Sequence, residues 1–436
     1  MKRNLYTKLL EWAQSRERKP ILLRGARQVG KSWLVRELGK NFQHYIEINF
    51  EENPALKTFF EGNLDPQEVV TQISNYYGVP IVPGETLLFL DEIQVCPRAI
   101  TALRYFYEKM PTLHTIGAGS LLEFELQNMS MPVGRIDHLY LYPMSCGEFL
   151  EAMGKENLRK QIDTQQALPE IIHKQLLSLV RDYVIIGGMP EVVQQYVETQ
   201  NIQACQKIQS NLIETYQKDF IKYAKRSQIK YLRLLFEAIP LQCGNKFVYH
   251  HVSQDIKSRE LNDALDLLEM AGIAHKVYHS SCTGIPLGAQ VDLKKFKLIF
   301  FDIGLAQRIL GLDIKQLILN PDITLINKGA MAELFVGLEL IANSEPHQKT
   351  KLYYWQREKR GAQSEVDYVT TVANQIVPIE VKSGSRGRLY SLNIFLEEKK
   401  IKYGLKICQN IYNASGKIIE VPFYSIEGLN HLLLRL

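Results

Sequence analysis

The residues best suited to chemistry near the amino terminus form the loop GARQVGKS at residues 25–32. Its spacing, G-x-x-x-x-G-K-[ST], lets the backbone turn so that successive N–H groups face phosphate oxygens. We expect Lys31 to reach the β and γ phosphates of a nucleotide and the Ser32 hydroxyl to bind Mg²⁺. The predicted nucleotide contacts are Gly25, Ala26, Arg27, Gln28, Val29, Gly30, Lys31, Ser32 and Trp33.

Two adjacent carboxylates end the apolar run TLLFLDEIQ at residues 86–94. Continuous hydrophobicity is typical of a strand buried on both faces of a parallel sheet, with polar residues emerging at its carboxyl end. Since a phosphate loop precedes this strand, we expect Asp91 to hold Mg²⁺ through water and Glu92 to activate the attacking water.

A second group of chemical residues lies in EVDYVTTVANQIVPIEVKSG at residues 365–384. Glu380 and Lys382 are two residues apart on an apolar strand, so both side chains leave the same face. That spacing is weak evidence alone, because E-x-K recurs elsewhere in the chain. A hairpin that turns through two residues at 373–374 would also place Asp367 directly opposite Glu380.

Facing carboxylates repel each other unless a cation or a proton lies between them. A hard divalent ion such as Mg²⁺, bound by oxygen, would meet this need at Asp367 and Glu380. Lys382 would then orient or activate the water that attacks a phosphodiester and would stabilise the developing charge. The alternative is that this segment has the same strands and the same residues but no catalytic activity.

The elements around the first site alternate between strands and helices. A strand, the loop and a helix occupy residues 19–40, a second strand is expected at 44–53, and a helix at 99–110. Residues 113–124 are expected to form a strand that runs into a loop. This order predicts an α/β fold with a parallel sheet, helices on both faces and ligand at the carboxyl ends of the strands.

The middle of the chain has helical periodicity from residue 151 to 227, with one break at Gly187-Gly188-Met189-Pro190. Residues 247–281 predict two helices and a hairpin, the order of a winged helix. The second helix presents acidic residues, so we expect protein packing rather than DNA reading. The adjacent His250 and His251 lack further ligands at metal-binding spacing, so surface positions are expected.

Several segments together resemble the prokaryotic AAA-type P-loop ATPases that carry a DUF4143 carboxyl-terminal domain: GARQVGKS, LLFLDEIQ, AGS at 118–120, residues 132–150 and GGMPEVV at 187–193. The resemblance implies ATP as the nucleotide, ATP hydrolysis and a helical lid. It also implies a sensor after the fourth core strand. Many relatives have Thr-Gly-Ser there, so Ser120 is the hydroxyl left in this chain. Arg135 is the candidate for stabilising charge on the transferring phosphoryl group.

The same resemblance implies a restriction-endonuclease-like fold around Asp367, Glu380 and Lys382. Glu333, in a predicted helix at 327–343, matches the acidic residue that completes such a metal site; an exposed helix glutamate is the alternative. The predicted organisation is an AAA-type ATP-binding core (1–150), a helical lid or connector (151–230), a winged-helix-like region (231–325) and a restriction-endonuclease-like DUF4143 domain (326–436).

Composition narrows the class of protein. The 436 residues are 46% hydrophobic and 23% charged, which is typical of folded globular domains. The net charge of +5 is small for this length, so the chain could bind nucleic acid only through a local basic patch. Six scattered cysteines without a C-x-x-C pair indicate neither a zinc site nor a disulfide framework. With no signal peptide or membrane span recognisable, we expect a cytoplasmic protein.

We therefore expect an ATP- and Mg²⁺-dependent hydrolase whose nucleotide state controls the carboxyl-terminal domain, with nucleic acid or a protein as that domain's partner. An ATP-gated interaction module with an inactive nuclease-like fold is the main alternative. A P-loop kinase for a small molecule is a third, disfavoured by the long chain beyond the core. An oligomer is compatible with this family resemblance.

Overall fold

The computed structural model describes residues 1–120, 122–126, 134–162, 167–222, 224–312, 328–357, 364–384 and 389–434. The chain divides into two compact units. The first contains Met1–Tyr142, Met270–Gly272 and Glu345–Lys349, and the second contains Pro143–Glu269, Ile273–Ser344 and Thr350–Leu436. Almost all of the predicted lid, winged-helix-like and carboxyl-terminal regions therefore lie in the second unit.

Strands and helices alternate in the first unit, as the sequence predicts. Its elements are α1 (Leu5–Gln14), β1 (Ile21–Arg24), α2 (Lys31–Gly39), β2 (His44–Asn49), the 3₁₀ helix η1 (Pro54–Phe60), α3 (Pro66–Tyr77), β3 (Thr86–Asp91), the 3₁₀ helix η2 (Ile93–Val95), α4 (Pro97–Lys109), β4 (His114–Ala118), α5 (Leu122–Leu126) and β5 (Asp137–Tyr140).

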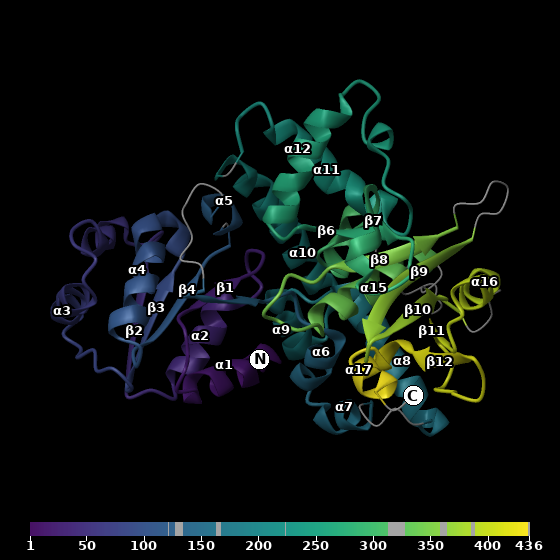
Figure 1. Ribbon diagram of the computed structural model, residues 1–436, viewed down its shortest axis with the longest axis horizontal. Helices are drawn as coiled ribbons and strands as arrows, with labels where there is room; N and C mark the ends of the chain where they lie inside the picture. The colour runs from purple at the N-terminus through teal and green to yellow at the C-terminus, as the bar shows by residue number, and fades with distance from the viewer. Residues whose placement is uncertain are drawn as a thin grey trace. The chain divides into compact units, whose positions relative to one another are not determined.

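The first sheet has five parallel strands in the order β2-β3-β4-β1-β5, which confirms the predicted parallel α/β core. All six residues of β3 are buried, because strands in the middle of such a sheet are covered on both faces. Helix α2 packs against β3 and β4, and α4 packs against β4 (Figure 1). The strand β4 therefore separates β1, which leads into the phosphate loop, from β3, which ends at Asp91.

The second unit begins with helices and continues as a mixture of strands and helices. Its elements are α6 (Cys146–Ala152), α7 (Glu156–Ile162), α8 (Glu170–Ile186), α9 (Pro190–Thr199), α10 (Ile202–Asp219), η3 (Phe220–Lys222), α11 (Ile229–Gln242), η4 (Tyr249–His251), α12 (Ser258–Met270), β6 (Ala274–Ser280), η5 (Leu287–Gln290), β7 (Val291–Phe300), α13 (Ile303–Ile309), α15 (Lys328–Ala342), β8 (Leu352–Gln356), β9 (Glu365–Val372), β10 (Gln375–Val381), α16 (Tyr390–Lys399), β11 (Gly404–Cys408), β12 (Ile418–Pro422), η7 (Phe423–Ser425) and α17 (Leu429–Leu433).

One mixed sheet of seven strands runs through this unit in the order β12-β11-β10-β9-β8-β6-β7. The hairpin of β6 and β7 follows α11 and α12, in the order expected of a winged helix, yet β6 pairs in parallel with β8. In Figure 1 the green strands β6 and β7 and the yellow-green strands β8 to β10 accordingly form one continuous sheet. The predicted winged-helix-like and carboxyl-terminal regions thus share a sheet.

The glycine break between α8 and α9 meets a residue from a distant part of the chain. Asp302 is buried and accepts hydrogen bonds from the N–H groups of Gly188, at 2.7 Å, and Leu305, at 2.8 Å. A Cβ atom at Gly187 would lie 2.4 Å from a carboxylate oxygen of Asp302, and the φ of Gly187 is +78°. Glycine is therefore needed where the helices turn.

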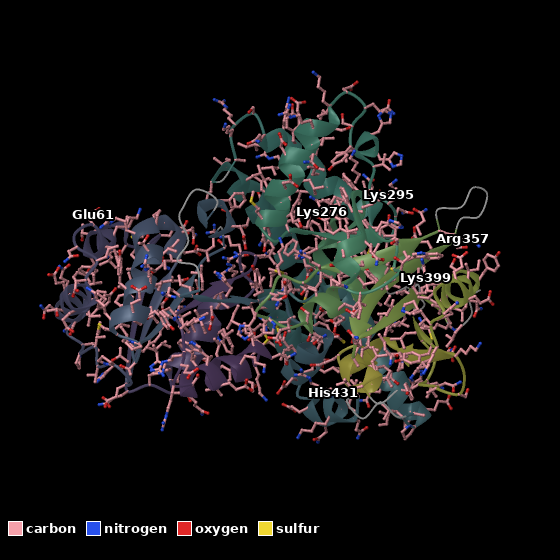
Figure 2. All side chains as sticks on the ribbon, viewed as in Figure 1. Glu61, Lys276, Lys295, Arg357, Lys399 and His431 are labelled. Carbon is pink, nitrogen blue, oxygen red and sulfur yellow. The ribbon has the colours of Figure 1, made fainter. Side chains whose placement is uncertain are left out.

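The second predicted helix of the winged-helix-like region, α12, carries the acidic residues for which we expect protein packing and not DNA binding. Asp266 and Glu269 form ion pairs with Lys276 of β6, whose Nζ lies 2.7 Å from Oδ1 of Asp266 and 3.1 Å from Oε2 of Glu269. Lys276 is labelled in Figure 2. The helix thus uses two of its acidic residues in ion pairs within the fold.

All six cysteines are buried as free thiols. Among the helices in the described parts of the chain, none has the length and apolar character needed to cross a membrane.

Candidate nucleotide site and carboxyl-terminal acidic cluster

The loop between β1 and α2 has a backbone that two glycines make accessible. Gly25 has a φ of +145°, and a Cβ atom there would lie 2.1 Å from the carbonyl oxygen of Leu141. Gly30 has a φ of +96° and immediately precedes α2. Because side chains are strained at such angles, the glycine spacing read from the sequence corresponds to a real backbone requirement.

Lys31, the first residue of α2, reaches back across the loop to its first residues. Its Nζ donates hydrogen bonds to the carbonyl oxygens of Gly25, at 2.9 Å, and Ala26, at 2.8 Å. Burial lowers the pKa of Lys31 to about 8, while the carboxylates of Glu92 and Asp91 oppose that shift. The buried ammonium therefore lies where it can meet a phosphate group bound by the loop.

The hydroxyl of Ser32 donates a hydrogen bond of 2.7 Å to Oδ2 of Asp91. Oδ1 of the same carboxylate accepts the N–H of Glu92 at 3.0 Å. Burial raises the pKa of Asp91, and the bond from Ser32 opposes this shift. The two predicted magnesium ligands, Ser32 and Asp91, are thus in direct contact and offer the oxygen donors that Mg²⁺ prefers.

Glu92 is held by a residue that sequence reasoning missed. The Nε2 of Gln94 donates to Oε2 of Glu92 at 2.5 Å, and Glu92 itself has a φ of +50°. A Cβ atom at Gly119 would lie 1.9 Å from Oε1 of Gln94. The motif DEIQ contains Gln94, but only the folded chain shows that its amide contacts Glu92 and that Gly119 makes room for it.

The other predicted residues of this site have more varied surroundings. Ser120 follows β4 and is buried, and its Oγ has no hydrogen-bond partner among the described residues. Arg135 is half-exposed and donates to Glu108 of α4 at 3.1 Å. The roles of both remain predictions. In the loop region, Arg27 pairs with Glu51 at 3.6 Å, and Trp33 is 39% exposed.

Arg3 is a further residue without a sequence signal. It is buried, and its guanidinium donates to the carbonyl oxygens of Val29 and Tyr142, each at 2.7 Å. An arginine this far from the glycine-rich motif carries no recognisable spacing, so only the structure reveals that it supports the loop.

The hairpin of β9 and β10 turns where the sequence predicts. Ala373 and Asn374 have φ values of +48° and +65°, as a two-residue turn with two left-handed positions requires. Pairing runs from Gln375↔Val372 to Ile379↔Tyr368, which confirms the predicted register. Continued by one residue, the same register would set Asp367 opposite Glu380.

The two carboxylates of this pair have different partners. Oδ2 of Asp367 accepts the N–H of Val381 at 2.8 Å. Oε1 of Glu380 accepts from Lys382 at 2.5 Å, whereas Oε2 is buried and has no partner among the described residues. Burial and the neighbouring Asp367 raise the pKa of Glu380 to about 7, and Lys382 opposes the shift. The negative charge of Asp367 thus disfavours a second negative charge on Glu380.

Glu333 reaches the same cluster from α15 but through a lysine. It is only 8% exposed, unlike an ordinary surface glutamate of a helix. Its Oε1 accepts from the Nζ of Lys297 of β7 at 2.8 Å; the same nitrogen lies 2.6 Å from Glu365 and 4.0 Å from Asp367. Burial would lower the pKa of Lys297, but Glu333 and Glu365 outweigh it and raise the pKa.

A ready-made metal site with three protein ligands is not found among the described residues. Glu333, Asp367, Glu380 and Lys382 do come together, and the two residues missed from the sequence are Lys297 and Glu365. Lys297 lies in the strand KLIFF, where nothing in the spacing distinguishes it from a surface lysine. The roles of the four predicted residues remain predictions.

Three family models match separate parts of the chain. A model described as an AAA domain matches residues 17–150, and two domains of unknown function, DUF8612 and DUF4143, match residues 177–316 and 328–424. The DUF8612 match spans both the predicted lid and the predicted winged-helix-like region. No curated protein matches the chain.

Two of the solved structures that match parts of the chain are ATPases of Pyrococcus species. The Walker-type ATPase of Pyrococcus abyssi is 16% identical with a TM-score of 0.46, and the match covers 71% of this chain and 95% of that one. A signal transduction ATPase with numerous domains and a tetratricopeptide repeat sensor, from Pyrococcus horikoshii, is 11% identical with a TM-score of 0.27. That match covers 77% of this chain and 45% of the other.

The family matches confirm two parts of the predicted resemblance, the AAA-type core and the DUF4143 domain. The chain carries an AAA-type P-loop ATPase domain at residues 17–150 and, at residues 328–424, a DUF4143 domain of unknown function.

Proposed function

We propose that this chain binds ATP with Mg²⁺ at the loop of residues 25–33 and hydrolyses it. The observation that carries the proposal is the 2.7 Å contact between Ser32 and Asp91, which brings a hydroxyl and a carboxylate together beside a glycine-rich phosphate loop. These two residues would hold Mg²⁺, with Asp91 acting through water. When bound, the ion supplies positive charge to the β and γ phosphates.

In this proposal each protein group has one task. The loop N–H groups and Lys31 bind the phosphate oxygens, and Glu92 accepts a proton from the attacking water. The water oxygen forms a bond to the γ phosphorus while the bond to the β-γ bridging oxygen breaks, leaving ADP and inorganic phosphate. Ser120 would orient the γ phosphate or the water, and Arg135 would stabilise the transferring group in its own chain or a neighbouring subunit.

We further propose that nucleotide state is coupled to the carboxyl-terminal domain and that this domain is a Mg²⁺-dependent phosphodiesterase acting on nucleic acid. The support is the hairpin register, which if continued by one residue would set Asp367 beside Glu380, together with the buried Oε2 of Glu380, which has no hydrogen-bond partner among the described residues. Such a pair would hold a divalent ion. Lys382 would position the attacking water and stabilise charge on the phosphodiester.

A second candidate function is an ATP-gated module that binds a protein or DNA without cutting it. The observation that favours it is Lys297, whose ammonium already bonds to Glu333 and Glu365. Glu333 is the acidic residue that the family resemblance assigns to the metal. Because its carboxylate is paired with Lys297, this arrangement counts against a complete metal site for nuclease activity.

Two assays test these proposals. Steady release of phosphate from ATP without a phosphorylated acceptor is expected, and transfer to a small molecule would instead indicate a kinase. Cleavage of DNA or RNA should require Mg²⁺ or Mn²⁺ and disappear in Asp367→Ala and Lys382→Ala, but not in Asp292→Ala, a change outside the cluster. Cleavage that persists in the first two variants would remove the assignment, and no cleavage by the folded wild-type chain would favour the interaction module.

A further inference from the structure

One lysine is the meeting point of carboxylates from different elements of the second unit. The Nζ of Lys297 on β7 lies 2.8 Å from Glu333 of α15 and 2.6 Å from Glu365 of β9, with Asp367 of β9 at 4.0 Å. The side chain of Lys297 is only 2% exposed, and the ring of Tyr354 lies 5.3 Å from its Nζ. A buried ammonium needs such partners, because an unpaired buried charge is strongly unfavourable.

The fold fixes these groups in place. The backbone of Lys297 pairs with Val277 of β6. Tyr368 of β9 donates a hydrogen bond of 2.8 Å to the carbonyl oxygen of Glu333, which ties α15 to the hairpin. A Cβ atom at Gly337 of α15 would lie 2.4 Å from the hydroxyl of Tyr368, so the helix approaches the strand closely. The carboxylates are therefore held around the ammonium by rigid elements.

The ammonium excludes a divalent ion from the Glu333 side of the cluster. Ions of this kind bind carboxylate oxygens at about 2.0–2.6 Å, and the nitrogen of Lys297 occupies the space at 2.6–2.8 Å from the same oxygens. Two cations cannot share this position, since they would overlap and repel. Oε2 of Glu380, a residue only 5% exposed, has no hydrogen-bond partner in the described parts of the chain, so the neighbouring part of the cluster offers an oxygen that a cation could use.

We propose that Lys297 is the resident cation of this cluster: its ammonium holds Glu333 and Glu365 in place of a divalent ion. A neutral side chain at position 297 would convert Glu333, Glu365 and Asp367 into a divalent-cation site. Glu333 is then a partner of lysine and not a metal ligand in the wild-type chain. This inference does not depend on ATP hydrolysis or on phosphodiester cleavage, since it concerns only which cation Glu333 and Glu365 bind in the wild-type chain.

The test uses the full-length chain without nucleotide, with Mn²⁺ as the probe. Bound and free Mn²⁺ are separated by electron paramagnetic resonance, and thermal unfolding is followed with and without the ion. Lys297→Met, which has similar length and no charge, should bind one Mn²⁺ more than wild type, at least about tenfold more tightly than any wild-type binding. Mn²⁺ should also raise its unfolding temperature, and Glu333→Gln added to this variant should remove both effects.

Lys276→Met is the matched control. Lys276 also contacts two carboxylates and an aromatic ring, but Asp266 is half-exposed and both acids lie on one helix, α12. No additional Mn²⁺ is expected there. A folded Lys297→Met chain without additional Mn²⁺ binding overturns the proposal. If that variant folds only with Mn²⁺, the proposal is supported, and if Mn²⁺ fails to restore its fold, the proposal is rejected.

A measurement on chains that keep Lys297 decides the point independently of that variant. If wild type binds Mn²⁺ and Glu333→Gln abolishes that binding, Glu333 is a metal ligand beside an intact lysine and the proposal is wrong. Mn²⁺ binding that is unchanged in Glu333→Gln, or equally absent from both chains, is the expected result.

Discussion

The hydroxyl of Ser32 donates a 2.7 Å hydrogen bond to Asp91 and thereby joins the first turn of α2 to the end of β3. In the sheet, β4 separates β3 from β1, the strand that leads through the phosphate loop into α2. The contact shows how a parallel sheet brings together residues far apart in sequence, because its strands end at the same edge.

Replacing Lys31 by alanine should abolish measurable nucleotide binding. Its buried Nζ is the one side-chain ammonium shown bonded to the phosphate loop in the described structure, and phosphate loses that charge in the variant. We expect affinity for a fluorescent ATP analogue to fall at least about tenfold, which is about 1.4 kcal/mol. Lys40→Ala is the control, since Lys40 pairs with Glu37 at the exposed end of the same helix. Equal affinity in Lys31→Ala and wild type would contradict the assigned role.

Replacing Glu92 by glutamine should preserve nucleotide binding and suppress turnover. Glutamine keeps the shape of the side chain and its contact with Gln94, but it cannot accept a proton from water. Loss of a general base typically costs about 10²–10⁴-fold in rate, so phosphate release should fall by that order. Normal hydrolysis in Glu92→Gln would show that another group handles the water.

Adding one methyl group at Gly119 should lower turnover with little effect on binding. A Cβ atom there would lie 1.9 Å from Oε1 of Gln94, so Gln94 must move and release Glu92. We expect the rate constant for ATP hydrolysis to fall about tenfold or more, since small displacements of catalytic groups are costly. Gly62→Ala is the control, because a Cβ atom at Gly62 meets nothing within 4 Å. A large loss of nucleotide affinity in Gly119→Ala would indicate a role in binding instead.

Local chemistry explains what could be predicted from the sequence. The phosphate loop is encoded by glycines whose φ angles other residues avoid, and the register of β9 and β10 is encoded by the length of their turn. Each of these features depends on residues that are close in sequence. The turn alone therefore predicts Asp367 opposite Glu380, one pair beyond the last observed pair, Ile379 and Tyr368.

Other features depend on tertiary packing and have no local signal. The hairpin of β6 and β7 looks independent in sequence, but the open edge of β6 pairs with β8, and no pattern in either strand specifies that partner. Lys297 lies far from Glu333 and Glu365 in sequence, so its contact with them requires the folded sheet and α15. Gln94 and Arg3 support the nucleotide site for the same kind of reason.

Substitutions in the turn of the β9–β10 hairpin should raise or lower stability according to how well the new residues adopt left-handed φ angles. Ala373 and Asn374 are both left-handed, and Asn-Gly is the preferred sequence for such a turn. Ala373→Asn combined with Asn374→Gly should raise the free energy of unfolding of the second unit by about 1 kcal/mol, because the left-handed conformation costs residues other than Gly and Asn about 1–2 kcal/mol. Asn374→Val should lower it, because a branched side chain is strained there. Urea unfolding followed by Trp355 fluorescence measures both; equal stability of the two variants would contradict the observed turn.

Acid should destabilise the first unit partly through His138 of β5. Burial, aided by the positive charge of Arg24, lowers the pKa of His138 to about 4 from about 6.5. The folded chain therefore binds fewer protons than the unfolded chain between these values. The stabilisation is complete above pH 6.5 and is lost as the pH falls toward 4. The slope from this one group is at most about 1.4 kcal/mol per pH unit, and partial exposure reduces it.

The control for this pH dependence is a histidine replaced in the same way at an exposed position. His138→Gln removes the titrating group, so its unfolding temperature should change less than that of wild type between pH 7 and pH 5. His250→Gln should follow wild type, because His250 is exposed in η4. Thermal unfolding monitored by hydrogen exchange in peptides of β1 and β5 reports on the first unit. Identical pH profiles for His138→Gln and wild type would show that His138 is protonated as readily in the folded as in the unfolded chain.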